Sequence, residues 1–149
     1  MKVVLQRVKS ASVSVKGTKI SRISNGLMIL LGVTKTDTED DVKLLTDKIV
    51  KFRIFSDENN KMNLSVKDIS GSILVVSQFT LCGGWQKGRR PSFSSSAPPK
   101  LAKKLYLLFI SLLKNHDVHV KTGEFGAMMD VALINDGPVT FVMDSRDKI

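Results

Sequence analysis

The chain has 149 residues and a mass of 16.4 kDa, the size of one domain with a full hydrophobic core. Hydrophobic residues make up 42% and charged residues 25% of the sequence, a balance that excludes wholesale disorder. A single cysteine excludes an internal disulfide and, together with only two histidines, a zinc knuckle or ribbon.

The charge balance is strongly basic. The 23 Lys and Arg residues outnumber the 14 Asp and Glu residues and leave a net charge of +9, which favours a polyanionic partner, most commonly nucleic acid. The alternative is a basic protein that binds nothing anionic. The longest apolar run, 27–33, is far shorter than the roughly 20 residues of a membrane span, and the first residues lack the features of a signal peptide. We therefore expect a cytoplasmic protein with no membrane partner.

The N-terminal third is predicted to form strands. Val13 and Val15 alternate with polar residues, the pattern of a half-buried strand, and a turn at 16–18 leads into a strand over 20–23. The dipeptide Asn25-Gly26 is typical of a hairpin turn. The apolar segment 27–33 that follows indicates a strand buried on both faces.

Two segments have the apolar spacing of helices. The first is capped by Thr38 and begins with acidic residues, which the helix dipole favours there; its apolar stripe is Val42, Leu45, Ile49 and Phe52. The second begins at Pro98-Pro99, since proline fits the first turn of a helix, and its apolar stripe is Leu101, Leu105, Leu108, Phe109 and Leu112.

Further short strands are predicted over 53–55, 72–81, 118–120, 129–134 and 139–143, with an irregular stretch over 82–99. Between the last two strands, Asp136-Gly137 is typical of a hairpin turn, although Pro138 directly after it is less usual. Two helices among about eight strands predict one mixed α/β domain over residues 1–149, with a curved, barrel-like and mostly antiparallel sheet.

Standard catalytic motifs are missing from the sequence. It has no glycine-rich phosphate loop, and neither His116 nor His119 has a nucleophile partner nearby along the chain. A thiolate at Cys82 would need a base, so we interpret Cys82 as an incidental small residue.

Polar residues at the end of the predicted core strand 72–81 stand out. Ser77, Gln78 and Thr80 are costly in an apolar strand unless their polar atoms are paired. Either they bond to neighbouring backbone or they belong to a functional site.

Two motifs resemble the signatures of the D-aminoacyl-tRNA deacylases: Ser-Gln-Phe-Thr at 77–80 and Asn-Asp-Gly-Pro-Val-Thr at 135–140. The resemblance covers nearly the whole chain, in the family's order and at its length, and includes the segments 6–8, 53–55, 61–63, 87–93 and 123–129. It implies an enzyme that hydrolyses the ester between a D-amino acid and the terminal adenosine of tRNA. It also implies that glycine is removed from wrongly charged tRNA.

The resemblance further implies a homodimer with active sites at the subunit interface and with no metal or other cofactor. Gly137 and Pro138, joined by a cis peptide bond in the family, would project into the partner's pocket and exclude an L side chain, while Arg7 would hold that loop. The catalytic segment would be Ser77, Gln78, Phe79 and Thr80. The substrate pocket would include Phe125, Ala127, Met129 and Asn135.

An activated ester needs modest help for hydrolysis. Backbone N–H groups near Phe79 and Thr80 would stabilise the oxyanion, by roughly 2.7–4 kcal/mol per donor. Since no base accompanies Thr80 in the sequence, we favour assistance by the substrate's 2′-hydroxyl over Thr80 as a covalent nucleophile. Gln78 would then position the substrate, and Phe79 would shape its pocket.

A basic loop carries Lys87, Arg89 and Arg90, which suit the phosphates of a tRNA acceptor stem; a solvated charge run is the alternative. Directly before it, the segment 82–86 departs from the more polar stretch of the family. Trp85 in this segment either stacks on an unpaired base or covers the sheet.

Two other functions compete with this interpretation. One is a related deacylase of altered chirality, in which the bond between Gly137 and Pro138 is trans and certain L-aminoacyl esters are accepted. The other is a basic RNA-binding module without catalysis, which would bind tRNA regardless of its amino acid.

Overall fold

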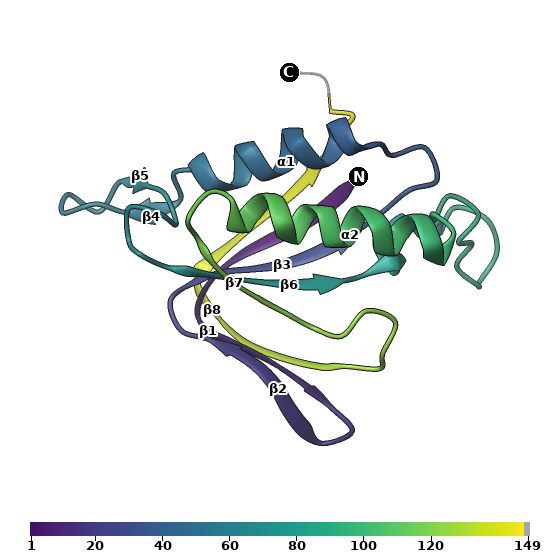
Figure 1. The fold of residues 1–149 in the computed structure, drawn as a ribbon, viewed down its shortest axis with the longest axis horizontal. Helices are drawn as coiled ribbons and strands as arrows, with labels where there is room; N and C mark the ends of the chain where they lie inside the picture. The colour runs from purple at the N-terminus through teal and green to yellow at the C-terminus, as the bar shows by residue number, and fades with distance from the viewer. Residues whose placement is uncertain (148–149) are drawn as a thin grey trace.

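A curved six-stranded sheet forms the centre of the fold (Figure 1). The computed structural model describes residues 1–147, and the strands of this sheet are β1 (Lys2–Val15), β2 (Thr18–Ile23), β3 (Gly26–Gly32), β6 (Ser72–Ser77), β7 (His119–Thr122) and β8 (Asp130–Asp144). Their order is β2-β1-β3-β6-β7, and β8 also pairs with β1. A separate two-stranded sheet pairs β4 (Phe55–Ser56) with β5 (Met62–Leu64).

Two α-helices lie side by side over one face of the sheet (Figure 1). Helix α1 (Glu39–Lys51) links β3 to β4, and helix α2 (Pro99–Lys114) links the end of β6 to β7. Both begin as predicted: Thr38 and Asp41 form a capping box before α1, and proline occupies the first turn of α2. Neither helix of the described chain is long and apolar enough to cross a membrane.

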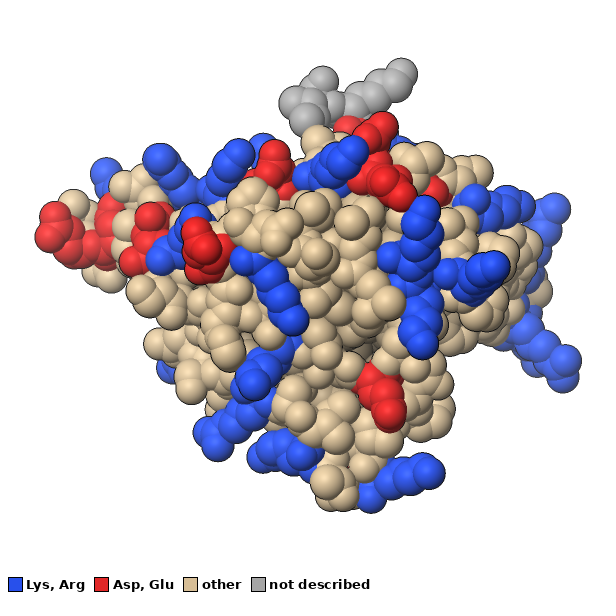
Figure 2. Space-filling view, in the orientation of Figure 1, with Lys and Arg blue, Asp and Glu red and all other residues tan. Residues whose placement is uncertain are grey.

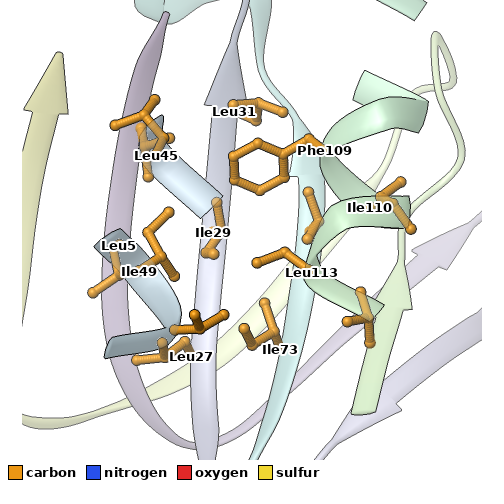
Figure 3. Close-up of a cluster of buried hydrophobic side chains, with 14 of the residues drawn as sticks. Leu5, Leu27, Ile29, Leu31, Leu45, Ile49, Ile73, Phe109, Ile110 and Leu113 are labelled. Carbon is orange, nitrogen blue, oxygen red and sulfur yellow. The ribbon is translucent and has the colours of Figure 1, made fainter. Parts of the chain in front are cut away.

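The apolar faces of the helices and the sheet meet in the main core. Figure 3 shows Leu45 and Ile49 of α1 and Phe109 of α2 packed against side chains of β1, β3 and β6, and all three helical side chains are at most 4% exposed. A second buried cluster, which includes Met28 and Leu74, lies on the other face of the sheet. Strands β3 and β6 are therefore buried on both faces, as the apolar run of β3 predicts.

The fold class is confirmed as mixed α/β with a mostly antiparallel, barrel-like sheet. Strand β1 pairs antiparallel with β2, β3 and β8, and β4 pairs antiparallel with β5. The pairs β3–β6 and β6–β7 are parallel. Parallel neighbours need a long crossover connection, and each of these two crossovers contains one of the helices.

The hairpin predicted at Asn25-Gly26 is wrong. Strands β2 and β3 do not pair with each other, because β1 lies between them in the sheet. Glycine is needed at position 26 for a different reason: its φ is +157°, and a Cβ there would collide with the carbonyl oxygen of Ser72.

The hairpin predicted at Asp136-Gly137 is also wrong. Strand β8 is continuous, and both of its halves pair with β1. Because Gln6 pairs with Thr140 and Val8 pairs with Asn135, the β8 residues 136–139 lie opposite Arg7 alone. The extra residues form a bulge within the strand instead of a turn between two strands.

Two other element boundaries differ from the prediction. The strand predicted over 72–81 ends at Ser77 and is followed by a short 3₁₀ helix, η1 (Phe79–Cys82), while the strand predicted over 53–55 is shifted to β4. The segment 79–82 is rich in residues that also favour strands, so the sequence pattern does not reveal where β6 ends.

A buried polar network ties together three parts of the chain. The Asp37 carboxylate, whose side chain is fully buried, accepts hydrogen bonds from the amino group of Met1 at 2.6 Å and from the Thr34 N–H at 2.6 Å; Arg146 lies 3.2 Å away. Burial by itself would raise the pKa of Asp37, but the hydrogen bonds from Met1 and Thr34 outweigh it and hold that pKa below its ordinary value.

We expect Asp37→Asn to destabilise the fold by about 3–5 kcal/mol at pH 7, because the buried Met1 ammonium group loses the carboxylate 2.6 Å away and keeps only that of Asp144, at 3.8 Å. Urea unfolding measures the loss. Since the pKa of folded Asp37 lies below the ordinary 3.8, its stabilisation is fully present above that pH and disappears as the pH falls through the lowered pKa. Asp40→Asn is the matched control, because Asp40 is 89% exposed. Equal stability of the two variants would show that the buried Asp37 carboxylate does not stabilise the fold.

Candidate active site

A cavity of about 640 Å³ lies between the end of β6 and the start of α2. Four segments of the chain line it: the end of β3, the end of β6 with the turn into η1, residues 96–106 at the start of α2, and residues 125–131 at the start of β8. The predicted catalytic residues Ser77, Gln78, Phe79 and Thr80 all line this cavity, as do the predicted pocket residues Phe125, Ala127 and Met129. The tertiary structure thus brings the segments 77–80 and 125–129, which are about 45 residues apart in the sequence, to one cavity.

The turn at the end of β6 leaves backbone donors at the cavity wall. The Gln78 N–H still bonds to the Leu31 carbonyl oxygen, at 2.8 Å, after which the chain turns into η1. The N–H groups at the start of a helix have no acceptor within it. Accordingly, those of Phe79 and Thr80 have no acceptor within the described part of the chain.

The polar side chains of this turn pair with each other. The Gln78 amide donates a hydrogen bond to the Thr80 hydroxyl. The sequence left two explanations for these polar residues: hydrogen bonds to neighbouring backbone, or a place in a functional site. The first does not apply to Gln78, because its side chain bonds to another side chain. Phe79 is 58% exposed and packs against Phe93, with ring centroids 4.9 Å apart.

Among the described residues that line the cavity, no side chain is suited to be a general base. Tyr106 of α2 is the one titratable side chain among the described residues that line the cavity. Burial raises the pKa of Tyr106 to about 12, and its hydroxyl donates to the Val75 carbonyl oxygen at 3.3 Å, so it stays protonated at neutral pH. Burial also raises the pKa of the Cys82 thiol, in agreement with its interpretation as an incidental residue. The described residues that line the cavity thus offer backbone groups and side chains that are neutral at pH 7.

Tyr106 is also a site residue that the sequence analysis missed. It is the single tyrosine of the chain and interrupts the apolar stripe of α2, which is the signal that would have found it. Ala102, one turn earlier in the helix, lines the same cavity and carries no such signal.

The predicted chirality-selecting residues form a second cluster, at the bulge of β8. The Arg7 guanidinium is 11% exposed and donates to the Asp136 carbonyl oxygen at 3.0 Å and to the Ile54 carbonyl oxygen at 2.6 Å. Gly137 and Pro138 are exposed, and the peptide bond between them is cis. The structure thus agrees with the cis bond that the family resemblance implies.

Asn135 closes the base of this bulge. Its side chain accepts a hydrogen bond from the Val139 N–H at 2.8 Å and donates one to the Thr140 hydroxyl at 2.9 Å. Asn135 was predicted as a pocket residue, yet it does not line the cavity of its own chain. The same holds for Arg7, Gly137 and Pro138.

The basic loop is held by a pair of backbone hydrogen bonds between Gly84 and Ser92, at 2.7 and 2.8 Å. Lys87, Arg89 and Arg90 are exposed in the loop, and none pairs with an acidic side chain of residues 1–147. Trp85 is 80% exposed, so it does not cover the sheet. Across the described ranges, no three His, Cys, Asp or Glu side chains are grouped to hold a metal ion.

Comparison with known proteins gives a consistent result. A family model described as D-Tyr-tRNA(Tyr) deacylase matches residues 4–144. A protein of Thermosipho africanus named D-aminoacyl-tRNA deacylase is 58% identical over 98% of this chain and 98% of its own length. A protein of the same name from Dictyoglomus turgidum is 54% identical over 99% of this chain and 94% of its own length.

Two solved structures share the fold. A structure described as c-Myc DNA unwinding element binding protein has a TM-score of 0.91 and 40% identity, over 97% of this chain and 98% of that chain. A probable eukaryotic D-amino acid tRNA deacylase has a TM-score of 0.83 over 95% of this chain and 97% of that chain. At 18% identity, this second likeness concerns the fold alone.

Proposed function

Because the chain belongs to the D-Tyr-tRNA(Tyr) deacylase family, we propose that it hydrolyses the ester bond of D-aminoacyl-tRNA and releases free tRNA and the D-amino acid. It would do so as a single domain over residues 1–149. The observation that carries the proposal is the turn after β6. There the family's first motif, Ser77–Thr80, lines a cavity and leaves two backbone N–H groups without acceptors.

The mechanism we propose follows from the lack of a base in the cavity. Water attacks the ester carbonyl carbon, and the N–H groups of Phe79 and Thr80 stabilise the oxyanion, by roughly 2.7–4 kcal/mol per donor. The 2′-hydroxyl of the terminal adenosine relays the proton of the attacking water to the leaving 3′-oxygen. Gln78 positions the substrate, and Phe79 forms one wall of its pocket. No metal or other cofactor takes part.

A homodimer would bring the two clusters together. Gly137 and Pro138 are exposed and do not line the cavity of their own chain, and in the dimer we propose they enter the cavity of the partner subunit. Strand β8 and the segment before it expose large apolar side chains: Met128 is 91%, Ile134 57% and Val142 75% exposed. Apolar exposure on this scale favours an interface, and we place the subunit contact along β8.

The bulge of β8 gives the chiral selectivity, because it excludes L-aminoacyl groups from the cavity. The backbone carbonyl groups at Gly137 and Pro138 would occupy the space that an L side chain needs, and a clash built against the wrong substrate discriminates more strongly than an added contact. Arg7 and Asn135 hold the bulge in place. Glycine has no side chain to clash, so glycyl-tRNA is hydrolysed as well. Lys87, Arg89 and Arg90 contact tRNA phosphates.

The test is hydrolysis of D-tyrosyl-tRNA, L-tyrosyl-tRNA and glycyl-tRNA by the purified protein in the presence of a chelator. We expect rapid loss of the D-tyrosyl and glycyl esters, with the L-tyrosyl ester spared, by a protein whose mass in light scattering is that of two chains. Loss of the L ester as well would indicate the enzyme of altered chirality. Binding of tRNA without hydrolysis would indicate an RNA-binding module.

Thr80→Ala separates the two mechanisms. We expect this variant to keep kcat within about tenfold of wild type, whereas removal of a covalent nucleophile costs roughly 10⁶-fold in a hydrolase. Single-turnover hydrolysis of D-tyrosyl-tRNA measures the difference. A complete loss of activity, in a folded variant that still binds tRNA, would show that Thr80 is the nucleophile.

Arg7→Lys tests the support of the bulge. Lysine cannot reproduce the two directed hydrogen bonds of Arg7 to the carbonyl groups of Ile54 and Asp136. We expect the ratio of kcat/KM for D-tyrosyl-tRNA over L-tyrosyl-tRNA to fall by roughly tenfold, the equivalent of one charge-assisted hydrogen bond. Arg53→Lys on the exposed surface nearby is the control. An unchanged ratio in Arg7→Lys would refute this role.

A further inference from the structure

Trp85 is the most prominent side chain that the proposed chemistry does not use. It is the single tryptophan of the chain, is 80% exposed, and lies in the loop closed by Gly84 and Ser92. Its closest cations along the chain are Lys87, Arg89 and Arg90, which have no acidic partner within residues 1–147. Figure 2 shows Lys and Arg side chains standing out at the end of the molecule where this loop and the start of α2 lie.

Two further aromatic side chains connect this loop to the cavity. Phe93, 37% exposed, directly follows Ser92 at the base of the loop, and its ring lies 4.9 Å from that of Phe79. Phe79 is 58% exposed and lines the cavity. Gly83 permits this arrangement, because a Cβ there would lie 3.1 Å from the Phe93 ring. Trp85 directly follows Gly84 and Phe93 directly follows Ser92, so the same antiparallel bridge anchors both aromatic residues at the base of the loop.

We propose that Trp85, Phe93 and Phe79 form an aromatic strip that binds the unpaired nucleotides at the 3′ end of tRNA. The inference rests on the proposed function, since a terminal ester bound in the cavity requires the nucleotides before it to leave over the cavity rim. Exposed aromatic rings stack with unpaired bases of any sequence, and flanking cations neutralise the phosphates between them. Phe79 lies nearest the ester, and Trp85 holds a base several nucleotides upstream.

Charge favours this occupant over a protein partner. A protein partner would have to offer apolar contacts to the exposed tryptophan and acidic side chains to three neighbouring cations at once. A nucleic acid strand supplies bases for the rings and phosphates for the cations at the same time. The net charge of +9 adds long-range attraction for the same polyanion.

Fluorescence of the single tryptophan tests the inference directly, without any need for catalysis. The probes are an RNA hairpin with a four-nucleotide 3′ overhang that carries no amino acid, and the same hairpin with a blunt end. We expect the overhang hairpin to quench Trp85 emission in a saturable way and the blunt hairpin to leave it nearly unchanged. Equal quenching by both hairpins, or quenching by neither, would overturn the proposal. So would an emission shift that depends on protein concentration alone, since Trp85 would then contact a second copy of the chain.

Two variants at position 85 give an independent measurement of affinity. We expect Trp85→Ala to weaken binding of the overhang hairpin by about five- to 150-fold, the range for one base–aromatic stack, and Trp85→Phe to keep most of the affinity. Leu107→Ala is the matched control, because Leu107 is a large apolar residue that is 52% exposed on α2. If Trp85→Ala binds as tightly as Leu107→Ala, the aromatic strip is refuted.

The hydrolysis and fluorescence measurements test the two proposals separately, so that one proposal can be refuted while the other is supported. Overhang-specific quenching in a protein that hydrolyses no aminoacyl-tRNA would refute the proposed function and support the strip. Hydrolysis of D-tyrosyl-tRNA with an unchanged KM in Trp85→Ala would support the function and refute the strip.

Discussion

The pairing of β1 with β8 is the constraint on which the rest of the structure depends. Strand β1 is also the partner of β2 and β3, so a change in its register would affect every part of the sheet. The β1–β8 register shifts at Arg7, where residues 136–139 have no partners in β1. Because both halves of β8 remain paired, this irregularity is a fixed projection with a defined direction.

The fold also fixes the position of the cluster at residues 77–80. Strand β6, buried on both faces, ends at Ser77, and the hydrogen bond from Gln78 to Leu31 holds the chain up to the point where it turns. Because β6 is buried, the N–H groups of Phe79 and Thr80 follow a well-anchored strand end, as the proposed oxyanion stabilisation requires. Helix α2 lines the same cavity and contributes Tyr106, whose raised pKa keeps it neutral. In such a cavity, backbone N–H groups can stabilise the negative charge that develops on an oxygen, as the ester hydrolysis we propose requires.

In the function we propose, both clusters act on the substrate through backbone groups, and this suits a proofreading enzyme. Backbone carbonyl groups cannot move by rotamer changes, so a filter built from them would exclude an L side chain whatever its identity. Affinity must then come from the part that all tRNAs share. The proposed aromatic strip and basic loop, which recognise bases and phosphates without regard to sequence, would supply it.

The sequence by itself determined the elements with strong periodicity. Both helices with their starting residues, the doubly buried β3 and the family motifs follow from local spacing, because side-chain period and capping chemistry act within a few residues. The tertiary structure alone decided the rest. Asn25-Gly26 and Asp136-Gly137 favour hairpins locally, yet pairing with β1 prevents the first and makes the second a bulge. Likewise, the position of residues 77–80 and 125–129 around one cavity depends on the β3–β6–β7 order, since strand partners are chosen by burial of whole faces and not by neighbours in the chain.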